Sequence, residues 1–505
     1  MTRKQQVEYG DFQTPAFLAE HIVMFLKKEG INPDVIVEPT CGLGSFIKAA
    51  IKEFGPHPLY YGFDLNAAYL KQVKESISRT HFRLHLACQN FFQQDWPMFF
   101  DNFTSHNILV IGNPPWVTNA TLGAIGSVNI PTKTNLQGYR GFHAKTGKAN
   151  FDIAEWMLIK LIESLQKNSG CLAMLCKIAT ARKVLQYAWK REMKISHSSL
   201  HTINAKTHFD ASVNACLFVT HVGQSCQTRD ATVYSGLHFT DRLYRFGMYG
   251  KDLIADLDAY DQLKDIDGIA YYTWRSGVKH DAVKVMEFTK YGHLINGFGE
   301  SVDIEQEYVF PLLKSSDIGN HRLIPRKYVL LPQKHIGDDT QEIKIYAPKT
   351  WNYLLRYADI LDKRKSSIYI KRPRFSIFGV GEYSFAPWKV TISGLYKHMQ
   401  FVVIGNFQGK PIMVDDTCYF IPCFSEDEAF FVSNLLNSER CQRFLQSLVF
   451  WDAKRPITKE ILQRIDLKKL AEYSHLEEQA YKYLTCTQIS FTGQSSFVFD
   501  RKGLY

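Results

Sequence analysis

Apolar residues in the first part of the chain follow two patterns that succeed one another. Short continuous apolar runs predict buried strands, and apolar residues spaced three and four apart predict helices. The predicted helices are Phe17–Lys28, Ser45–Phe54 and Phe151–Gln166. The predicted strands are Val35–Val37, Tyr60–Asp64, Asn107–Ile111, Cys171–Leu175 and Ala215–Thr220. Strands that alternate with helices predict an α/β fold, with an open and largely parallel sheet covered on both faces.

The pattern changes after about Thr220. The predicted strands become shorter, and aromatic and basic residues are interleaved, most clearly in Ser366–Lys397. Helical spacing returns in Ser425–Leu470. The polar stretch Gly223–Asp230 separates the two regions, so we predict one domain over residues 1–225 and a second, α+β domain with its own core over 226–505.

Composition narrows the class of protein only a little. The 505 residues are 45% hydrophobic and 22% charged, which excludes a disordered chain. The net charge of +10 suits a protein that meets a polyanion, although an ordinary basic enzyme has the same excess. The ten cysteines form no metal-ligand spacing, so we expect reduced thiols and no metal site. Neither a signal peptide nor a membrane-length apolar run is apparent, so the prediction is a cytoplasmic protein without a membrane partner.

A glycine turn between a strand and a helix is the first candidate binding site. The stretch Val37–Phe46 reads VEPTCGLGSF, in which a strand ends at Glu38 and a turn leads into a helix whose first N–H groups are free. Asp64 ends the next strand, at the spacing where nucleotide-binding folds place an acid on ribose hydroxyls. The turn lacks the third glycine of NAD sites and the Gly-Lys-Ser/Thr of phosphate loops.

The sequence Asn113-Pro114-Pro115-Trp116, which follows the strand at 107–111, is a more specific signal. Two prolines fix the backbone and remove two N–H donors, so the turn presents hydrogen-bond acceptors beside an aromatic face. The Asn113 amide oxygen and a backbone carbonyl would accept the two hydrogens of a planar amine, while Trp116 stacks on its ring.

These motifs together resemble a known family. GDFQTP, EPTCGLGSF, YYGFDLN and GNPPW are similar, in this order, to motifs of the gamma-class N6-adenine DNA methyltransferases of restriction–modification systems. The resemblance continues through residues 150–156 and 170–177, and THFDASVNACLFV places Phe209 where the family has an aromatic residue that supports a flipped base. Later segments, among them RPRFSIFGVGEYSFAPWKVTISGLYK and FWDAKRPITKEILQRIDL, resemble target-recognition domains.

The resemblance implies a Rossmann-like domain that binds S-adenosyl-L-methionine, followed by a target-recognition domain. Thr14 would meet the methionine end of the cofactor, and Glu38 would hold its amino-acid portion together with the turn. Asn90 stands where many members have aspartate, and its side-chain oxygen would accept from the adenine amino group. The implied cofactor-binding residues are Thr14, Glu38, Thr40, Cys41, Gly42, Gly44, Asp64, Leu65, Asn90, Phe91 and Asn113.

The same resemblance implies methylation of the N6 amino group of an adenine flipped out of duplex DNA. Trp116 stands where tyrosine or phenylalanine is commoner, which keeps the stacking face and loses a hydroxyl. The implied catalytic residues are Asn113, Pro114, Pro115, Trp116 and Phe209. The expected DNA contacts are Lys371, Arg372, Arg374, Lys389, Lys454 and Arg455, whereas we expect His280 and Asp281 to be structural or to position DNA.

Several alternatives remain open from sequence. The acceptor could be N4 of cytosine, an RNA base or a protein glutamine, because the Asn-Pro-Pro-aromatic motif serves all three. A DNA-binding subunit without activity would be expected to have lost Glu38, Asp64 or Asn113, which are intact. No nuclease domain is recognisable, so a fused restriction enzyme is disfavoured. The expected partners are double-stranded DNA and, separately, a cognate restriction endonuclease, and we expect a monomer.

Overall fold

The computed structural model describes residues 13–77, 82–117, 152–223 and 227–484. The chain divides into two compact units, Met1–Asp258 and Ala259–Tyr505. The first unit therefore extends beyond residue 225, because three strands after that point continue its sheet. The functional division into residues 1–225 and 226–505 stays a prediction.

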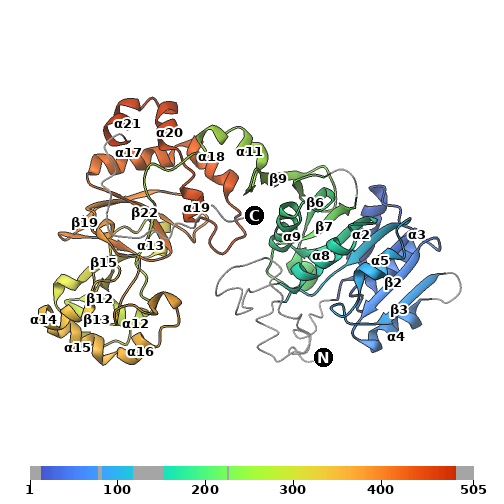
Figure 1. Cartoon of the computed structure of the whole chain (residues 1–505), viewed down its shortest axis with the longest axis horizontal. Helices are drawn as coiled ribbons and strands as arrows, with labels where there is room; N and C mark the ends of the chain where they lie inside the picture. The colour runs from blue at the N-terminus through green and yellow to red at the C-terminus, as the bar shows by residue number, and fades with distance from the viewer. Residues whose placement is uncertain (1–12, 78–81, 118–151, 224–226, 485–505) are drawn as a thin grey trace. The chain divides into compact units, whose positions relative to one another are not determined.

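A ten-stranded sheet forms the centre of the first unit (Figure 1). Its order is β10-β9-β8-β6-β7-β5-β4-β1-β2-β3. All neighbours among β1 to β5 are parallel, and β7 runs antiparallel to both β5 and β6. The strands are β1 (Val35–Glu38), β2 (Leu59–Asp64), β3 (Arg83–Cys88), β4 (Asn107–Gly112), β5 (Ser169–Lys177), β6 (Ile195–Ile203), β7 (Ala215–Val222), β8 (Asp230–Tyr234), β9 (Arg242–Tyr249) and β10 (Asp252–Ile254). The predicted open and largely parallel sheet is confirmed.

Helices cover this sheet because its central strands are apolar on both faces. Alternate residues such as Ile36, Leu109 and Ala173 pack in one core with α2 and α3, and the intervening residues are also buried. The helices of the unit are α2 (Ala16–Lys28), α3 (Ser45–Phe54), α4 (Ala67–Ser76), α5 (Trp96–Asp101), α8 (Ile153–Ser164), α9 (Ile178–Lys190) and α10 (Ala205–Phe209). Each helix and strand predicted above has a counterpart here, although Phe151 lies outside the described residues.

The second unit contains two larger sheets and one small hairpin. A six-stranded sheet has the order β14-β13-β12-β16-β15-β21, and a four-stranded sheet has the order β11-β22-β17-β18. Their strands are β11 (Arg275–Ser276), β12 (Glu287–Tyr291), β13 (His293–Ile295), β14 (Ser301–Val302), β15 (Val309–Leu313), β16 (Lys327–Leu330), β17 (Trp388–Ser393), β18 (Val402–Ile404), β21 (Met413–Val414) and β22 (Cys418–Cys423). β19 (Asn406–Phe407) pairs with β20 (Lys410–Pro411).

Short helices accompany these sheets, so the unit is α+β, as the sequence predicts. Residues of α14, α15 and α16 share a core with the six-stranded sheet, and α17 packs on β17. The helices are α11 (Leu257–Asp261), which spans the boundary between the units, α12 (Val283–Met286), α13 (Ser315–Gly319), α14 (Ile343–Tyr346), α15 (Pro348–Arg356), α16 (Ala358–Asp362), α17 (Glu426–Asn437), α18 (Glu439–Leu448), α19 (Lys459–Leu462), α20 (Leu467–Tyr473) and α21 (Glu477–Leu484).

Two searches across the described residues bear on the class of protein. None of the helices described here has both the length and the apolar character needed to cross a bilayer. In the same part of the chain, no group of three or more His, Cys, Asp or Glu side chains is placed to hold a metal ion.

Candidate active site

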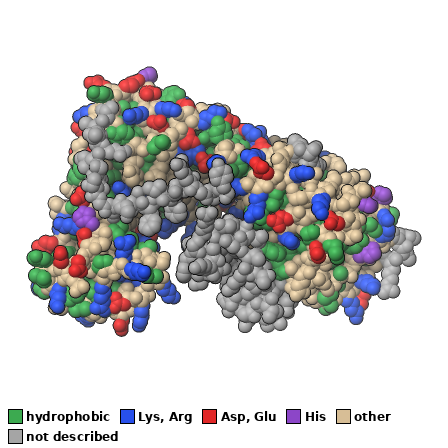
Figure 2. Space-filling model, in the orientation of Figure 1, with side chains coloured by type: hydrophobic (Ala, Val, Ile, Leu, Met, Phe, Trp, Pro, Cys, Tyr) green, Lys and Arg blue, Asp and Glu red, His purple; other side chains and the backbone are tan. Residues whose placement is uncertain are grey.

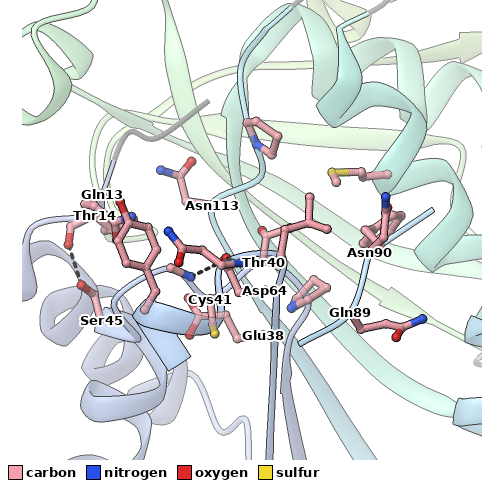
Figure 3. Close-up of a pocket in the computed structure, with 18 of the residues that line it drawn as sticks. Gln13, Thr14, Glu38, Thr40, Cys41, Ser45, Asp64, Gln89, Asn90 and Asn113 are labelled. Carbon is pink, nitrogen blue, oxygen red and sulfur yellow. Dashed lines mark hydrogen bonds between the residues drawn. The ribbon is translucent and has the colours of Figure 1, made fainter. Parts of the chain in front are cut away.

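A pocket of about 890 Å³, counted with its opening to solvent, lies at the carboxyl ends of β1, β2 and β4 (Figure 3). This is where open α/β sheets bind ligands. The predicted residues that line it are Thr14, Glu38, Thr40, Cys41, Gly42, Asp64, Leu65, Asn90, Phe91, Asn113 and Pro115. Gly44, Pro114, Trp116 and Phe209 are not part of its lining. The lining also contains residues for which no role was predicted, namely Gln13, Pro39, Ser45, Asn66, Tyr69, Gln89, Phe92 and Met157.

The glycine turn is built by contacts that cross the pocket. Gly42 and Gly44 have φ of 51° and 70°, the left-handed region that favours glycine. The Leu43 N–H donates to Oε1 of Gln13 at 3.0 Å, so the Thr-Pro segment closes over the turn. A Cβ on Gly44 would lie 2.9 Å from the Val73 side chain. This close approach explains why the position is a glycine although it does not line the pocket. Gly44 therefore supports packing beneath the pocket.

Glu38 is a buried acid at the end of β1. Its side chain is 3% exposed, and Oε2 accepts a hydrogen bond from the Ile47 N–H at 3.1 Å. Burial raises the pKa of Glu38 well above its ordinary value, the Ile47 hydrogen bond opposes that shift, and the charge of Asp64 adds to it. A buried carboxyl with a raised pKa in a pocket is stabilised by a ligand that brings positive charge.

Asp64 bridges two turns. Its Oδ2 accepts from the Gly42 N–H and its Oδ1 from the Asn66 N–H, both at 2.8 Å. These bonds fix the carboxylate in the wall of the pocket, where β2 ends. The nearby Cys41 is no nucleophile, because burial and then the charges of Glu38 and Asp64 raise the pKa of its thiol.

Thr40 and Thr14 complete this end of the pocket. The Oγ1 of Thr40 is buried and has no hydrogen-bond partner among the described residues. A buried hydroxyl without a partner costs free energy that a polar ligand would recover. The Thr14 carbonyl accepts from the Ser45 hydroxyl at 2.7 Å, which ties the residues before α2 to the start of α3.

Asn90 and Phe91 form the opposite end, after β3. The Oδ1 of Asn90 accepts from the Phe92 N–H at 2.9 Å, which closes a local turn. Phe91 is 4% exposed and contacts the rings of Phe92 and Trp96, with centroids 5.6 and 5.0 Å away. This end thus combines apolar rings with the amides of Gln89 and Asn90.

The Asn113–Trp116 loop follows β4, so Asn113 and Pro115 enter the same pocket as Glu38 and Asp64. Trp116 is anchored twice to β5: its Nε1–H donates to the Leu175 carbonyl at 3.3 Å, and its own carbonyl accepts from Lys177 Nζ at 3.2 Å. Lys177 also forms an ion pair with Asp152 at 2.7 Å, and the Asp152 carboxylate caps the start of α8. No role was predicted for Lys177 or Asp152, although they lie in the segments 170–177 and 150–156 that resemble the family.

Phe209 lies at the end of α10 and touches Trp116. Their ring centroids are 5.1 Å apart at 64°, an edge contact that leaves no space for a base between them. Phe209 itself is 8% exposed and belongs to the core. The structure therefore brings the two predicted aromatic residues together without forming an open slot.

Apart from Lys389, the predicted DNA contacts are exposed and fall into two groups. Lys371, Arg372 and Lys454 are exposed and form no ion pair with a described residue. Arg374 pairs with Asp362 at 2.6 Å, and Arg455 lies 3.8 Å from Asp416. Figure 2 shows basic and acidic side chains interspersed on the visible face, so no uniformly basic patch marks a footprint there.

The structure corrects the prediction that Lys389 contacts DNA. This residue lies on β17, is 2% exposed, and donates through Nζ to the Ala386 carbonyl at 2.9 Å. Burial lowers the pKa of Lys389 to about 7. The prediction of a DNA contact is wrong for this residue, because β17 is buried on both faces from Lys389 onward and the lysine side chain lies in the core.

The structure gives His280 a place in a buried hydrogen-bond network around Glu287. His280 is 6% exposed, and its Nε2 lies 3.2 Å from Glu287, which also accepts from Lys314 at 2.6 Å. Hydrogen bonds from His280 and Lys314 overcome the effect of burial and lower the pKa of Glu287 to about 2. Asp281 pairs with Lys279 at 3.0 Å.

Comparison with known proteins places the chain in a family. It is 45% identical over 473 residues to the type II methyltransferase M.NspV of Nostoc sp. (strain ATCC 29411 / PCC 7524), over 93% of this chain and 98% of the relative. No protein-family model matches. The type IIL restriction-modification enzyme MmeI, solved in complex with DNA, matches with a TM-score of 0.49 and 11% identity, over 92% of this chain and 65% of that chain. The M protein of the type I restriction enzyme EcoKI matches with a TM-score of 0.30 and 16% identity, over 45% of this chain and 48% of that chain. Because the match to M.NspV spans nearly all of both sequences, the chain belongs to the family of type II methyltransferases.

Proposed function

We propose that the protein transfers a methyl group from S-adenosyl-L-methionine to the N6 amino group of an adenine in duplex DNA, and thereby protects host DNA within a restriction–modification system. The observation that carries the proposal is that Asn113 and Pro115 line the same pocket as Glu38 and Asp64. An amine-binding loop and a nucleotide-type site thus share one wall, as methyl transfer between their ligands requires.

The pocket residues fit S-adenosyl-L-methionine. Glu38 and Asp64 offer negative charge to a ligand that carries an ammonium and a sulfonium, and the buried Thr40 hydroxyl offers a polar contact. Glu38 and the turn over 40–44 would hold the amino-acid portion, with Thr14 beside it, and Asp64 would hold the ribose hydroxyls. Leu65, Asn90 and Phe91 would enclose the adenine. When bound, this cofactor supplies an electrophilic methyl group.

The Asn113 loop would act on the target amine. The lone pair of an adenine amino group is delocalised into the ring, which makes the nitrogen a poor nucleophile. The Asn113 amide oxygen and the Pro114 carbonyl would accept its two hydrogens and favour a tetrahedral nitrogen with a localised lone pair. Positioning and stabilisation of the developing positive charge would supply the rate enhancement. The two anchors of Trp116 keep these acceptors in place.

A base in a duplex cannot reach this loop, so it would be flipped out at a cost of a few kcal/mol. Stacking on Trp116 and Phe209 would recover roughly 1–3 kcal/mol for each contact. Because the two rings touch at 5.1 Å, the base would enter only as Phe209 moves away from Trp116. The proposal therefore includes a rearrangement of α10 or of its last residue.

DNA as the substrate is supported by the family and by the second unit. The exposed residues Lys371, Arg372 and Lys454 are free of ion pairs within the described chain and suit phosphate contacts. Arg374 is held by Asp362 and would contact DNA only by exchanging that partner. A separate cognate endonuclease and a monomeric state are part of the proposal.

The test is to express the protein in a methylation-free bacterial host and sequence its DNA with single-molecule detection of modified bases. We expect N6-methyladenine at one short motif, and none with Asn113→Ala. Modified cytosine would move the reaction to N4. No modified base, with a folded protein that binds S-adenosyl-L-methionine, would overturn the DNA assignment and leave RNA, protein glutamine or a non-catalytic role in DNA binding.

A further inference from the structure

The pocket carries, after β3, an amide whose orientation is fixed by the backbone. Asn90 lines the pocket, and its side chain accepts a hydrogen bond from the Phe92 N–H at 2.9 Å. A backbone N–H can only donate, so the atom facing it must be the amide oxygen. The other end of the same amide, Nδ2, is therefore a donor with no hydrogen bond to a described residue.

The lining residues that neighbour Asn90 in the chain carry no charge. The two acidic lining residues are Glu38 and Asp64, and the oxygens of Asp64 already accept from Gly42 and Asn66. The lining residues next to Asn90 in the chain, Gln89, Phe91 and Phe92, carry one amide and two phenyl rings. A carboxylate at position 90 could only accept hydrogen bonds, whereas the amide found here also donates.

We infer that Asn90 donates from Nδ2 to an unprotonated ring nitrogen of the cofactor's adenine, so that this enzyme reads a purine acceptor and not only the exocyclic amino group. Adenine offers lone pairs on its ring nitrogens, and asparagine is well suited to pair with an adenine edge. The inference rests on the proposed function, since it concerns the adenine portion of the same ligand. It makes Asn90 a residue that determines cofactor specificity.

The matched variant is Asn90→Asp. A carboxylate has the same shape and still accepts from the Phe92 N–H, so the turn after β3 is kept, but it cannot donate. Gln89→Glu adds the same charge at the neighbouring lining position and serves as a control for electrostatics. Both variants retain every residue of the Asn113 loop.

The experiment measures binding of S-adenosylhomocysteine and of its 1-deaza, 3-deaza and 7-deaza analogues by titration calorimetry. In each analogue a C–H replaces one ring nitrogen. We expect the wild-type protein and Gln89→Glu to bind one of the three about tenfold more weakly than the parent. Asn90→Asp should bind that analogue as well as the parent or better, because the carboxylate repels the lone pair that the analogue lacks.

Two results would overturn these ideas at different levels. Equal ratios of analogue to parent affinity in wild type and Asn90→Asp, with tight binding of the parent, would refute the donor role and leave the proposed function intact. Failure of the folded wild-type protein to bind the parent compound would refute the proposed cofactor and the inference with it.

Discussion

Lys177 joins the Trp116 loop to the start of α8. Its Nζ lies 3.2 Å from the Trp116 carbonyl oxygen and 2.7 Å from Oδ2 of Asp152, with the lysine side chain 25% exposed and the aspartate 9%. One ammonium thus holds the loop that carries Asn113, although it does not line the pocket itself. Its position predicts an effect on the rate of methyl transfer that exceeds the effect on cofactor binding.

We expect Lys177→Met to lower the single-turnover methylation rate about tenfold or more, because the loop loses one of its two anchors. The dissociation constant for S-adenosylhomocysteine should change less than threefold, and Lys177→Arg should restore part of the rate. Lys183→Met is the matched control, since Lys183 joins α9 to Glu155 at 3.3 Å without touching the loop. Equal losses of rate in both methionine variants would mean that Lys177 acts through general stability.

Binding of the cofactor is expected to release protons through Glu38. The pKa of this buried carboxyl is raised above 4.5 in the free protein, and a cationic ligand would lower it again. Affinity should therefore increase with pH through the raised pKa of the free protein and level off above it. Calorimetry between about pH 5 and 8, in buffers of different ionisation enthalpy, measures the release directly. The same proton release in Glu38→Gln would contradict this assignment.

Lys371 and Arg372 are expected to contact phosphates. Alanine at either position should weaken DNA binding on specific and non-specific sequences alike, and reduce the slope of log affinity against log salt by about 1. Fluorescence anisotropy with a labelled duplex at several salt concentrations gives both quantities. Lys389→Met is the control, because its buried side chain cannot reach DNA, and its salt slope should equal that of the wild type.

Lys389 should also make stability depend on pH. Its pKa is about 7 in the folded protein, whereas an unfolded lysine titrates near 10.4. Between these values the unfolded chain binds one more proton, so the free energy of unfolding rises with pH from about 7 to about 10. Urea unfolding at several pH values should show this rise, of the order of a few kcal/mol, in the wild type. Lys389→Met should show a flatter profile and higher stability at pH 7.

Strands β1, β2 and β4 of the pocket could be predicted from their apolar residues, whereas β3, which precedes Asn90 and is mostly exposed, was not predicted. Val35 to Val37 and Ile108 to Ile111 are continuous apolar runs in the centre of a parallel sheet, and glycine marks the turn after the first. The Rossmann-like methyltransferase fold and the meeting of Asn113 with Glu38 follow from that order. The sequence could not show the Lys177 bridge, since the partners of one lysine depend on packing far along the chain.

β6 was absent from the prediction for a physical reason. Its buried positions carry polar residues that satisfy one another: the Ser198 and Thr220 hydroxyls lie 2.8 Å apart, and Ser199 lies 3.0 Å from the His201 ring. The sequence of such a strand is typical of a polar loop, and only its pairing with β7 shows that these polar side chains are buried and satisfied. The prediction for Lys389 was wrong for the opposite reason. A basic residue among aromatic residues suggested a contact on the surface, but the core encloses this side chain.

The three strands after residue 225 decide where the chain can be cut. β8 pairs with β6 in parallel, and β9 and β10 extend the sheet to Asp258. A truncation at residue 225 would leave the nine-residue β6 as a bare edge, which is a template for aggregation. A truncation after Asp258 would leave the three-residue β10 as the last strand instead. Chimaeras that exchange the second unit between relatives should therefore be joined after this strand.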